Sequence, residues 1–135
     1  MRTIVLLIAV LLGLASPAPA ADDIAAAQNV IRSQEQAFSK DDAAAAYSYA
    51  APAIKQLFPQ AAIFMYMVQN SYAPIYRHKG FVFGEARAAD GRIAQRVDII
   101  DANDEAWEAL YTLVQQPDGS LKITGCSLLK AGQAV

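Results

Sequence analysis

The C-terminal half of the chain constrains the fold most strongly. After Pro74, apolar side chains recur at every second position, and this pattern is interrupted by the turn sequences ADG, DANDE and QPDG. A period of two is that of a β-strand, and Asp-Gly and Pro-Asp-Gly favour tight turns. We therefore predict four strands that pair antiparallel in chain order as a meander. Their expected ranges are residues 79–88, 92–101, 106–115 and 121–129.

The segment before Pro74 has the longer period of helices. Between residues 22 and 39, apolar side chains recur every three or four residues, and polar side chains fill much of the opposite face. This pattern predicts an amphipathic helix entered through Asp22 or Asp23. Because helices precede strands along the chain, we predict an α+β fold with the helices packed on one face of a curved four-stranded antiparallel meander.

Shorter helices are expected between this helix and the sheet. Asp41 or Asp42 can cap a helix over residues 43–47, and a short segment over 52–58 follows the next proline break. A third helix is predicted over 60–71. It contains six consecutive apolar residues, which sample every side of a helix. The third helix is therefore either buried on more than one side or lines a pocket.

Alternation along the predicted strands assigns each side chain to one face of the sheet. Ten apolar side chains share the face that we assign to the helices, and burying each contributes roughly 1.5–3 kcal/mol before entropy is subtracted. They are Phe81, Phe83, Ile93, Val97, Ile99, Trp107, Tyr111, Leu113, Leu121 and Ile123.

The opposite face mixes charged and apolar side chains, whereas a solvated face would alternate more cleanly. We interpret it either as a homodimer surface or as an exposed sheet with scattered apolar residues. The candidate dimer residues are Val82, Ile100, Leu110, Val114, Cys126 and Leu128.

The N-terminus has the pattern of a secretory signal peptide over residues 1–20. Arg2 supplies the positive start, an apolar run covers residues 4–14, and Ala-Pro-Ala precedes the expected cleavage between Ala20 and Ala21. A membrane anchor is the alternative, but this run covers only about half of a ~30 Å hydrocarbon core as a helix. We predict a periplasmic or secreted protein with one domain over residues 21–135 and no stable membrane span after cleavage.

The charge of the processed chain disfavours nucleic acid as a partner. Removing Arg2 leaves ten basic and 13 acidic side chains, a formal charge of −3, whereas sequence-independent nucleic-acid binding needs clustered Lys and Arg. Cys126 is the only cysteine. It is interpreted as a small buried apolar residue or as a bridge between two chains. One histidine and one cysteine in different segments give no metal-ligand spacing, and no cofactor motif is present.

Three stretches carry a resemblance to a known family. AAYSYAAPAIKQLFP, MVQNSYAPIYR and LYTLVQQPDGSLKITGC resemble the small exported bacterial proteins of domain of unknown function family 4864. The order of the elements resembles the NTF2-like, or cystatin-like, superfamily of cone-shaped domains. The resemblance covers about residues 24–129 and implies a helix-lined concavity closed by the sheet. Superfamily members use it for isomerase or dehydratase chemistry, for binding or for dimerisation, and the fold alone does not choose among these.

Inward-facing polar side chains are the candidates for chemistry. On the helix-facing side of the sheet we expect Tyr111, Glu85 and Gln95. Further tyrosines come from the helices. The candidate pocket residues are Tyr47, Phe64, Met67, Tyr72, Tyr76, Glu85 and Tyr111. They contain no carboxylate–histidine pair, so we assign no catalytic residue.

The charged residues at the start of the first strand are expected in solvent. Arg77 and Lys79 should share a side and His78 should point the other way, because neighbours in an extended segment alternate. His78 is expected at the surface, and its burial against a carboxylate would instead favour the enzyme alternative. The resembled family often has proline at the position of His78, which also argues against a shared catalytic role. Asp98 and Asp101 are likewise expected to be solvated.

Three functions remain open. The leading one is a non-enzymatic domain that binds a small apolar or amphipathic ligand, or a partner chain, because the third helix is apolar on all sides and the predicted interior is rich in tyrosine and poor in carboxylates. The alternatives are an isomerase or dehydratase that uses tyrosine hydroxyls and Glu85, and a structural homodimer.

Overall fold

The computed structural model describes residues 19–132, and the predicted signal segment up to residue 18 lies outside the described residues. The helices are α1 (Pro19–Ser39), α2 (Ala43–Ser48), α3 (Pro52–Leu57), α4 (Ala61–Ser71) and α5 (Ala73–Tyr76). The strands are β1 (His78–Ala89), β2 (Arg92–Asp101), β3 (Ala106–Gln115) and β4 (Leu121–Lys130). They form one antiparallel sheet in chain order, so the predicted α+β class and meander are confirmed.

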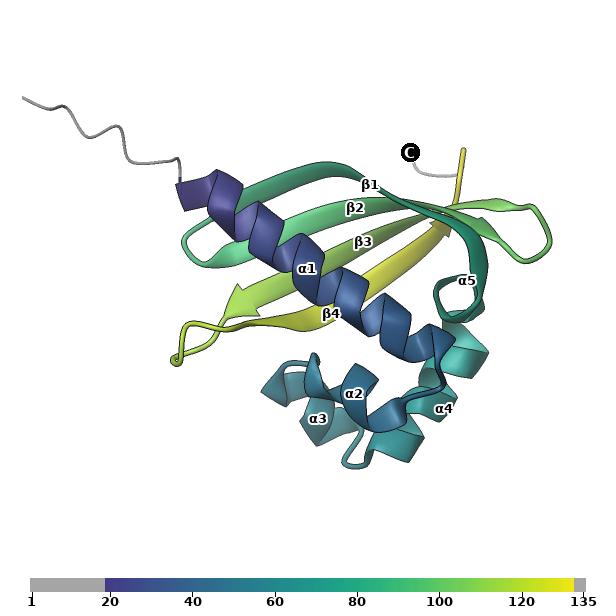
Figure 1. Cartoon of the computed structure of the whole chain (residues 1–135), viewed down its shortest axis with the longest axis horizontal. Coiled ribbons are helices and arrows are strands. Elements are labelled where there is room, and N and C mark those ends of the chain that lie inside the picture. The colour runs from purple at the N-terminus through teal and green to yellow at the C-terminus, as the bar shows by residue number, and fades with distance from the viewer. Residues whose placement is uncertain (1–18, 133–135) are drawn as a thin grey trace, which may run out of the picture.

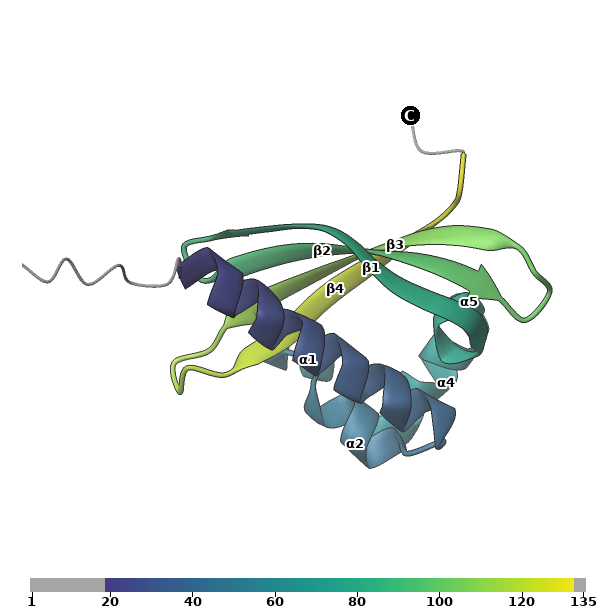
Figure 2. The ribbon, with the colours of Figure 1, turned by 45° about the horizontal axis from the view of Figure 1, so that its top comes forward.

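The molecule has a helical layer and a sheet layer. α1 crosses one face of the curved sheet, and α2 to α4 gather on the same side beneath its end (Figure 1). The second view shows that the described helices all lie on this side and leave the other face of the sheet open (Figure 2). The sheet therefore has an inner face toward the helices and an outer face away from them.

The core lies between α1 and the inner face. Ile31 and Phe38 of α1 and Val97, Ile99 and Leu113 of the sheet are at most 1% exposed. Of the ten residues predicted for this face, Phe83 and Trp107 are half-buried and the other eight are buried. The period of two therefore located the core side of the sheet correctly.

A β-bulge in β1 reverses the direction of Glu85. Gly84 and Glu85 together oppose Arg96 of β2, and an extra residue in one strand shifts the alternation that follows it. Glu85 is exposed and lines a groove on the outer face. The prediction that Glu85 faces the helices is wrong for this reason.

Gln95 holds the bulge in place. This residue is fully buried on the inner face. Its Nε2 donates to the carbonyl oxygens of Gly84 at 3.1 Å and Arg96 at 2.7 Å, and its Oε1 accepts from Nε2 of Gln28 in α1 at 3.0 Å. Since a bulge interrupts the ladder of backbone hydrogen bonds, the Gln95 amide supplies a substitute partner and ties the bulge to α1.

A second bulge changes the faces of β4. The register shift between Thr112 and Leu113 leaves Thr124 without a partner residue in β3. Beyond it, Cys126 and Leu128 pack against the core. The prediction that these two residues belong to the outer face is therefore wrong, because it assumed unbroken alternation through β4.

The connections between elements follow local rules. Asp42 caps α2 by accepting a hydrogen bond from the Ala45 N–H at 3.1 Å, as predicted. α5 differs from the prediction, in which the helical half ends at Pro74. Proline is tolerated in the first turn of a helix, where its missing N–H is not needed, and Pro74 stands in that turn of α5.

Asp101 organises the loop between β2 and β3. It is only 7% exposed; its Oδ1 accepts from the backbone N–H groups of Asn103 and Glu105 and its Oδ2 from the Trp107 indole N–H, all at 2.8 to 2.9 Å. These donors, the indole first, lower the pKa of Asp101. The expectation that Asp101 is solvated is wrong, because the loop after it folds back and brings three donors, from residues two to six positions later, onto its carboxylate. Asp98 is exposed, as expected.

Candidate functional site

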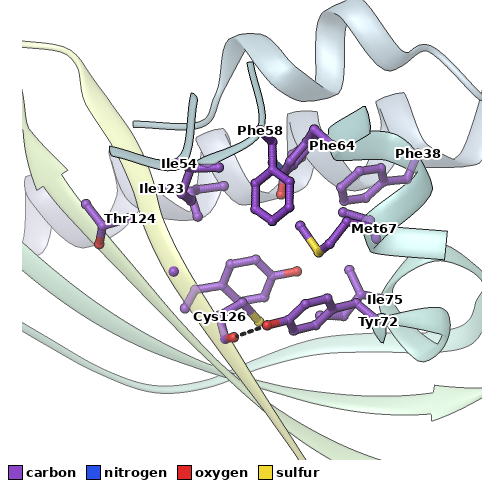
Figure 3. A pocket seen from close by; sticks show the side chains of 14 residues that line it. Phe38, Ile54, Phe58, Phe64, Met67, Tyr72, Ile75, Ile123, Thr124 and Cys126 are labelled. Atoms are coloured by element: carbon purple, nitrogen blue, oxygen red, sulfur yellow. Dashed lines mark hydrogen bonds between the residues drawn. The ribbon is translucent and has the colours of Figure 1, made fainter. Parts of the chain in front are cut away.

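A cavity of about 230 Å³ lies between the helices and the inner face of the sheet (Figure 3). Its walls come from α1, α3, α4, the segment around α5, β3 and β4. The lining residues are Gln34, Phe38, Ile54, Phe58, Phe64, Met67, Val68, Tyr72, Ile75, Tyr111, Ile123, Thr124, Gly125 and Cys126.

The cavity explains part of the apolar character of the third predicted helix. In α4, Phe64 and Val68 are buried, Met67 is half-buried, and all three line the cavity. Ile63 and Tyr66 on the same helix are exposed. Of the two alternatives for this helix, lining a pocket is the one that the structure shows.

The cavity is closed on one side and more open on the other. Phe38, Phe64 and Val68 are buried, whereas Ile54 of α3 and Cys126 of β4 are half-buried. Figure 3 shows Phe58, Phe64 and Met67 across the space from Tyr72 and Cys126. Phe58, Met67 and Tyr72 are half-buried as well, so the cavity is partly open to solvent.

Tyr111 is the main polar group of the closed side. It is 2% exposed, and its hydroxyl makes no hydrogen bond to any group within residues 19–132. Protein atoms do not cover the hydroxyl oxygen completely. The oxygen therefore borders the free space of the cavity that Tyr111 lines. Burial, with smaller effects from Cys126 and Glu35, raises the pKa of Tyr111 well above its ordinary value. The hydroxyl therefore stays protonated and is available as a donor.

Tyr72 and Cys126 meet beside Tyr111, because Cys126 of β4 is the cross-strand partner of Tyr111 in β3. The Tyr72 hydroxyl donates to the Cys126 carbonyl oxygen at 3.1 Å (Figure 3). Burial raises the pKa of Tyr72, with Cys126 as a further cause, and burial raises the pKa of the Cys126 thiol to about 12. At neutral pH the thiol is a neutral, weakly reactive group.

The cavity wall carries no ionisable acid or base among the described residues, apart from tyrosine and cysteine. Gln34 is buried and donates its amide to the Ala46 carbonyl oxygen at 3.2 Å. No Asp, Glu, His, Lys or Arg is among the lining residues. The cavity is thus an apolar space with a few neutral polar groups.

Four of the seven predicted pocket residues line this cavity: Phe64, Met67, Tyr72 and Tyr111. Contact of any of them with a ligand stays a prediction. Sequence reasoning missed Gln34 and Phe38, although both stand on the apolar stripe of the first predicted helix. It also missed Cys126, which the bulge in β4 turns inward.

The remaining predicted pocket residues lie elsewhere. The Tyr47 hydroxyl donates to the carbonyl oxygen of Phe58, and the Tyr76 hydroxyl bonds the Asp41 carboxylate. Neither residue lines the cavity. Both hydroxyls are engaged with the protein, and Glu85 is on the other face of the sheet.

Arg77 and Lys79 are exposed, as expected, and each has an acidic partner. Arg77 Nη2 lies 2.7 Å from Asp41 Oδ1, and Lys79 Nζ lies 2.8 Å from Asp104 Oδ1. The hydrogen bond from Tyr76, followed by that from Arg77, lowers the pKa of Asp41. These ion pairs leave the two cations no special affinity for an anionic ligand.

His78 is not a surface residue, so that prediction is wrong. Its side chain is 15% exposed, and its ring lies 4.9 Å from the Phe81 ring between centroids. Nε2 is 2.9 Å from Glu35 Oε2, and Nδ1 is 3.1 Å from the Ile75 carbonyl oxygen. The carboxylate belongs to α1, 43 residues earlier in the chain, and no local pattern indicates such a partner.

The pairing of His78 with Glu35 joins α1 to β1. Both ring nitrogens face acceptors, so both contacts are hydrogen bonds only when the ring carries both protons. The other Glu35 oxygen accepts from Arg32 at 2.7 Å, and the Arg32 guanidinium lies over the Phe83 ring, 4.7 Å from its centroid. None of these groups lines the cavity. Within residues 19–132, no cluster of three or more His, Cys, Asp or Glu is placed to hold a metal ion.

The outer face holds a second concavity, a groove of about 610 Å³ centred on Arg96. A Cβ on Gly84 would stand 2.7 Å from Arg96 Nη2, so the guanidinium lies directly over this glycine. Arg96 Nε is buried without a hydrogen bond, although Glu108 Oε1 lies 3.3 Å away. The distance between Arg96 Nε and Glu108 Oε1 is that of an ion pair, but the N–H does not point at the oxygen and so makes no hydrogen bond.

Leu110 and Leu129 line this groove, and Val82 and Ile100 lie elsewhere on the outer face. These four side chains are between 39% and 62% exposed. Val114 of the predicted dimer face is half-buried. The outer face therefore keeps Val82, Ile100, Leu110 and Val114 from the predicted set and gains Leu129.

Within residues 19–132, no helix has both the length and the apolar character needed to cross a membrane.

Comparison with known proteins gives one match. The model of the family described as Domain of unknown function (DUF4864) matches residues 20–134. The chain has no match among the curated proteins or among the solved structures. The family match spans all the described helices and strands except the first residue of α1. The chain therefore belongs to the DUF4864 family of domains of unknown function.

Proposed function

We propose that this protein is an exported, non-enzymatic domain of the NTF2-like kind that binds a small apolar or amphipathic ligand in the cavity between helices and sheet. The cavity itself carries the proposal: about 230 Å³ of space lined by apolar side chains, with the Tyr111 hydroxyl unpartnered within residues 19–132. The helices on one face of a curved meander support the NTF2-like assignment.

The size of the cavity limits its ligand. An apolar cavity of roughly 150 Å³ holds benzene, whereas drug-sized ligands need roughly 300–1,000 Å³. At about 230 Å³, this cavity suits a single substituted ring or a short acyl chain. A ligand of this size has few atoms in contact with protein, so its dissociation constant should be on the order of 0.1–1 mM.

Binding fits the cavity better than catalysis does. The enzyme alternative needs an inward carboxylate, and Glu85, the proposed one, is exposed on the outer face. His78 and Glu35 form an acid–base pair, but their nitrogens and oxygens bond to each other, to Arg32 and to Ile75. General acid–base catalysis requires such a group within hydrogen-bonding reach of the substrate.

Export is proposed from the signal pattern of the first 20 residues. Cleavage between Ala20 and Ala21 falls in the first turn of α1, which begins at Pro19, and leaves the rest of the helix intact. Intact-mass measurement of the protein purified from its native compartment tests this: a chain that begins at Ala21 supports export, and one that retains residues 1–20 refutes it.

The binding test uses toluene as the probe and NMR of ¹⁵N-labelled protein as the readout. Titration of residues 21–135 should shift the amide signals of Met67 and Cys126 first. Met67→Trp fills the cavity and should abolish binding. Tyr66→Trp is the matched control, because Tyr66 immediately precedes Met67 in α4 and its side chain is 68% exposed. If neither toluene nor phenol shifts a cavity signal, or if both variants bind toluene equally, the proposed function fails.

A homodimer formed through the outer face is a second candidate function. The outer face exposes Val82, Ile100, Leu110 and Leu129 around a groove that holds Glu85 and Glu108 beside Arg87 and Arg96. Because both signs of charge occur on one face, a second copy related by a two-fold axis can place acidic groups against basic ones. This complementarity favours a second copy over a partner with charge of one sign.

Sedimentation tests the dimer directly. Wild type should sediment as a dimer, and Leu110→Glu should sediment as a monomer. Leu57→Glu is the matched control, since Leu57 is 74% exposed on α3, away from the outer face. A wild-type monomer at 100 µM, or a dimer that survives Leu110→Glu, rules this candidate out.

A further inference from the structure

The polar groups of the cavity are unequally available to a ligand. The Tyr72 hydroxyl donates to the Cys126 carbonyl oxygen at 3.1 Å, and one of the two N–H groups of the Gln34 amide donates to the Ala46 carbonyl oxygen at 3.2 Å. The Tyr111 hydroxyl, on a side chain that is 2% exposed, has no partner within residues 19–132. It is therefore a hydroxyl of the cavity wall whose hydrogen remains available to a ligand.

The surroundings of Tyr111 decide which ligand charge is acceptable. No Lys, Arg or His is among the described residues that line the cavity, so an anionic ligand would lose its hydration without gaining a counter-charge. A neutral ligand avoids this cost.

We propose that the cavity selects a neutral, ring-sized ligand with one hydrogen-bond acceptor, such as a phenol or an aryl ketone, and that Tyr111 is the residue that determines this specificity. The inference rests on the proposed function and deepens it. The ligand ring occupies the apolar space between Phe64, Met67 and Ile123, and its oxygen accepts the hydrogen bond of the Tyr111 hydroxyl. A buried donor left without a partner is unfavourable. After the difference in hydration between the two ligands is removed, an apolar ligand of the same shape should therefore bind more weakly than one that accepts this hydrogen bond.

Phenol and toluene form the probe pair, because they differ by one hydroxyl in place of one methyl group. Their dissociation constants are measured by NMR titration for wild type, for Tyr111→Phe and for Tyr72→Phe. Comparing the phenol-to-toluene ratio between variants removes the different hydration of the two compounds, as in a double-mutant cycle. Tyr72→Phe is the control, because its hydroxyl is already engaged with Cys126.

Tyr111→Phe should lower the preference for phenol over toluene by about two- to tenfold, the value of one neutral hydrogen bond. Tyr72→Phe should leave the ratio within about 1.5-fold of wild type. Benzoate should bind wild type at least about tenfold more weakly than phenol, because its charge has no partner in the cavity. This comparison needs no variant.

The outcomes separate the two proposals. If toluene and phenol both bind but Tyr111→Phe leaves their ratio unchanged, or if benzoate binds as well as phenol, the specificity inference is overturned and the binding function stands. If neither phenol nor toluene binds wild type, the binding function and the specificity inference are both overturned.

Discussion

Tyr111 and Tyr72 are two cavity tyrosines whose hydroxyls have opposite roles, and removing each hydroxyl alone distinguishes them. Tyr72 donates to the Cys126 carbonyl oxygen at 3.1 Å, whereas the Tyr111 hydroxyl has no partner among the described residues. Tyr72→Phe and Tyr111→Phe both delete one oxygen and keep the ring. Any difference in stability between them therefore reports the hydrogen bond rather than the packing.

The expected changes in the free energy of unfolding have opposite signs. A neutral hydrogen bond contributes about 0.5–1.5 kcal/mol net, so Tyr72→Phe should lower the free energy of unfolding by about 1 kcal/mol. Burying a hydroxyl without a partner costs about 1–3 kcal/mol. Tyr111 is 2% exposed, and Tyr111→Phe should therefore leave stability unchanged or raise it by up to about 1 kcal/mol.

Urea unfolding followed by far-UV circular dichroism measures both changes. At a slope of about 2 kcal/mol per molar urea, the Tyr72→Phe midpoint should fall by about 0.5 M and the Tyr111→Phe midpoint should stay or rise. If Tyr111→Phe is destabilised as much as Tyr72→Phe, the Tyr111 hydroxyl has a partner in the folded protein. The argument that it is free for a ligand would then be refuted.

Three further predictions concern buried groups outside this pair. Because the pKa of Cys126 is about 12, iodoacetamide at pH 8 should alkylate the folded protein on the order of 10³-fold more slowly than the urea-unfolded chain; rates within tenfold of each other by mass spectrometry would contradict this. Hydrogen bonds lower the pKa of Asp101 in the folded state, so its contribution to stability is present above the unfolded pKa of about 3.9 and is lost as pH falls through the folded value. Asp101→Asn should therefore lower the urea midpoint at pH 7 more than at pH 3, and an equal loss at both would refute the linkage. Removing the His78 contact with Glu35 by His78→Ala should lower the free energy of unfolding by about 1–2 kcal/mol, and a midpoint equal to wild type in urea would show that the contact contributes nothing.

The sequence reveals features that depend on local periodicity. Apolar side chains at every second position, with Asp-Gly turns between the runs, predict the four strands and their meander order, because pleat and turn geometry depend on neighbouring residues. The apolar stripe of α1 and the Asp42 cap are local in the same sense. Even the cavity has a local signal, since the apolar run of α4 exceeds what a one-sided helix needs.

The two bulges show where local reasoning ends. A single extra residue at Glu85 or at Thr124 reverses every later assignment of faces in that strand. The register between two paired strands cannot be read from the sequence of either strand alone. Unbroken alternation therefore predicts Glu85 inside and Cys126 outside, and the structure shows the reverse. The bulge in β1 is stabilised by Gln95 and Gln28, which lie in other elements.

The sequence by itself determined the class of fold, the order of the strands and the core side of the sheet, because these follow from the periodicity of short segments. Only the tertiary structure decided which polar groups have partners. His78 meets Glu35 across 43 residues, and the Tyr111 hydroxyl borders the cavity without a hydrogen-bond partner among residues 19–132. The availability of a buried polar group depends on segments that are distant in the chain, so the candidate site became visible only in the folded molecule.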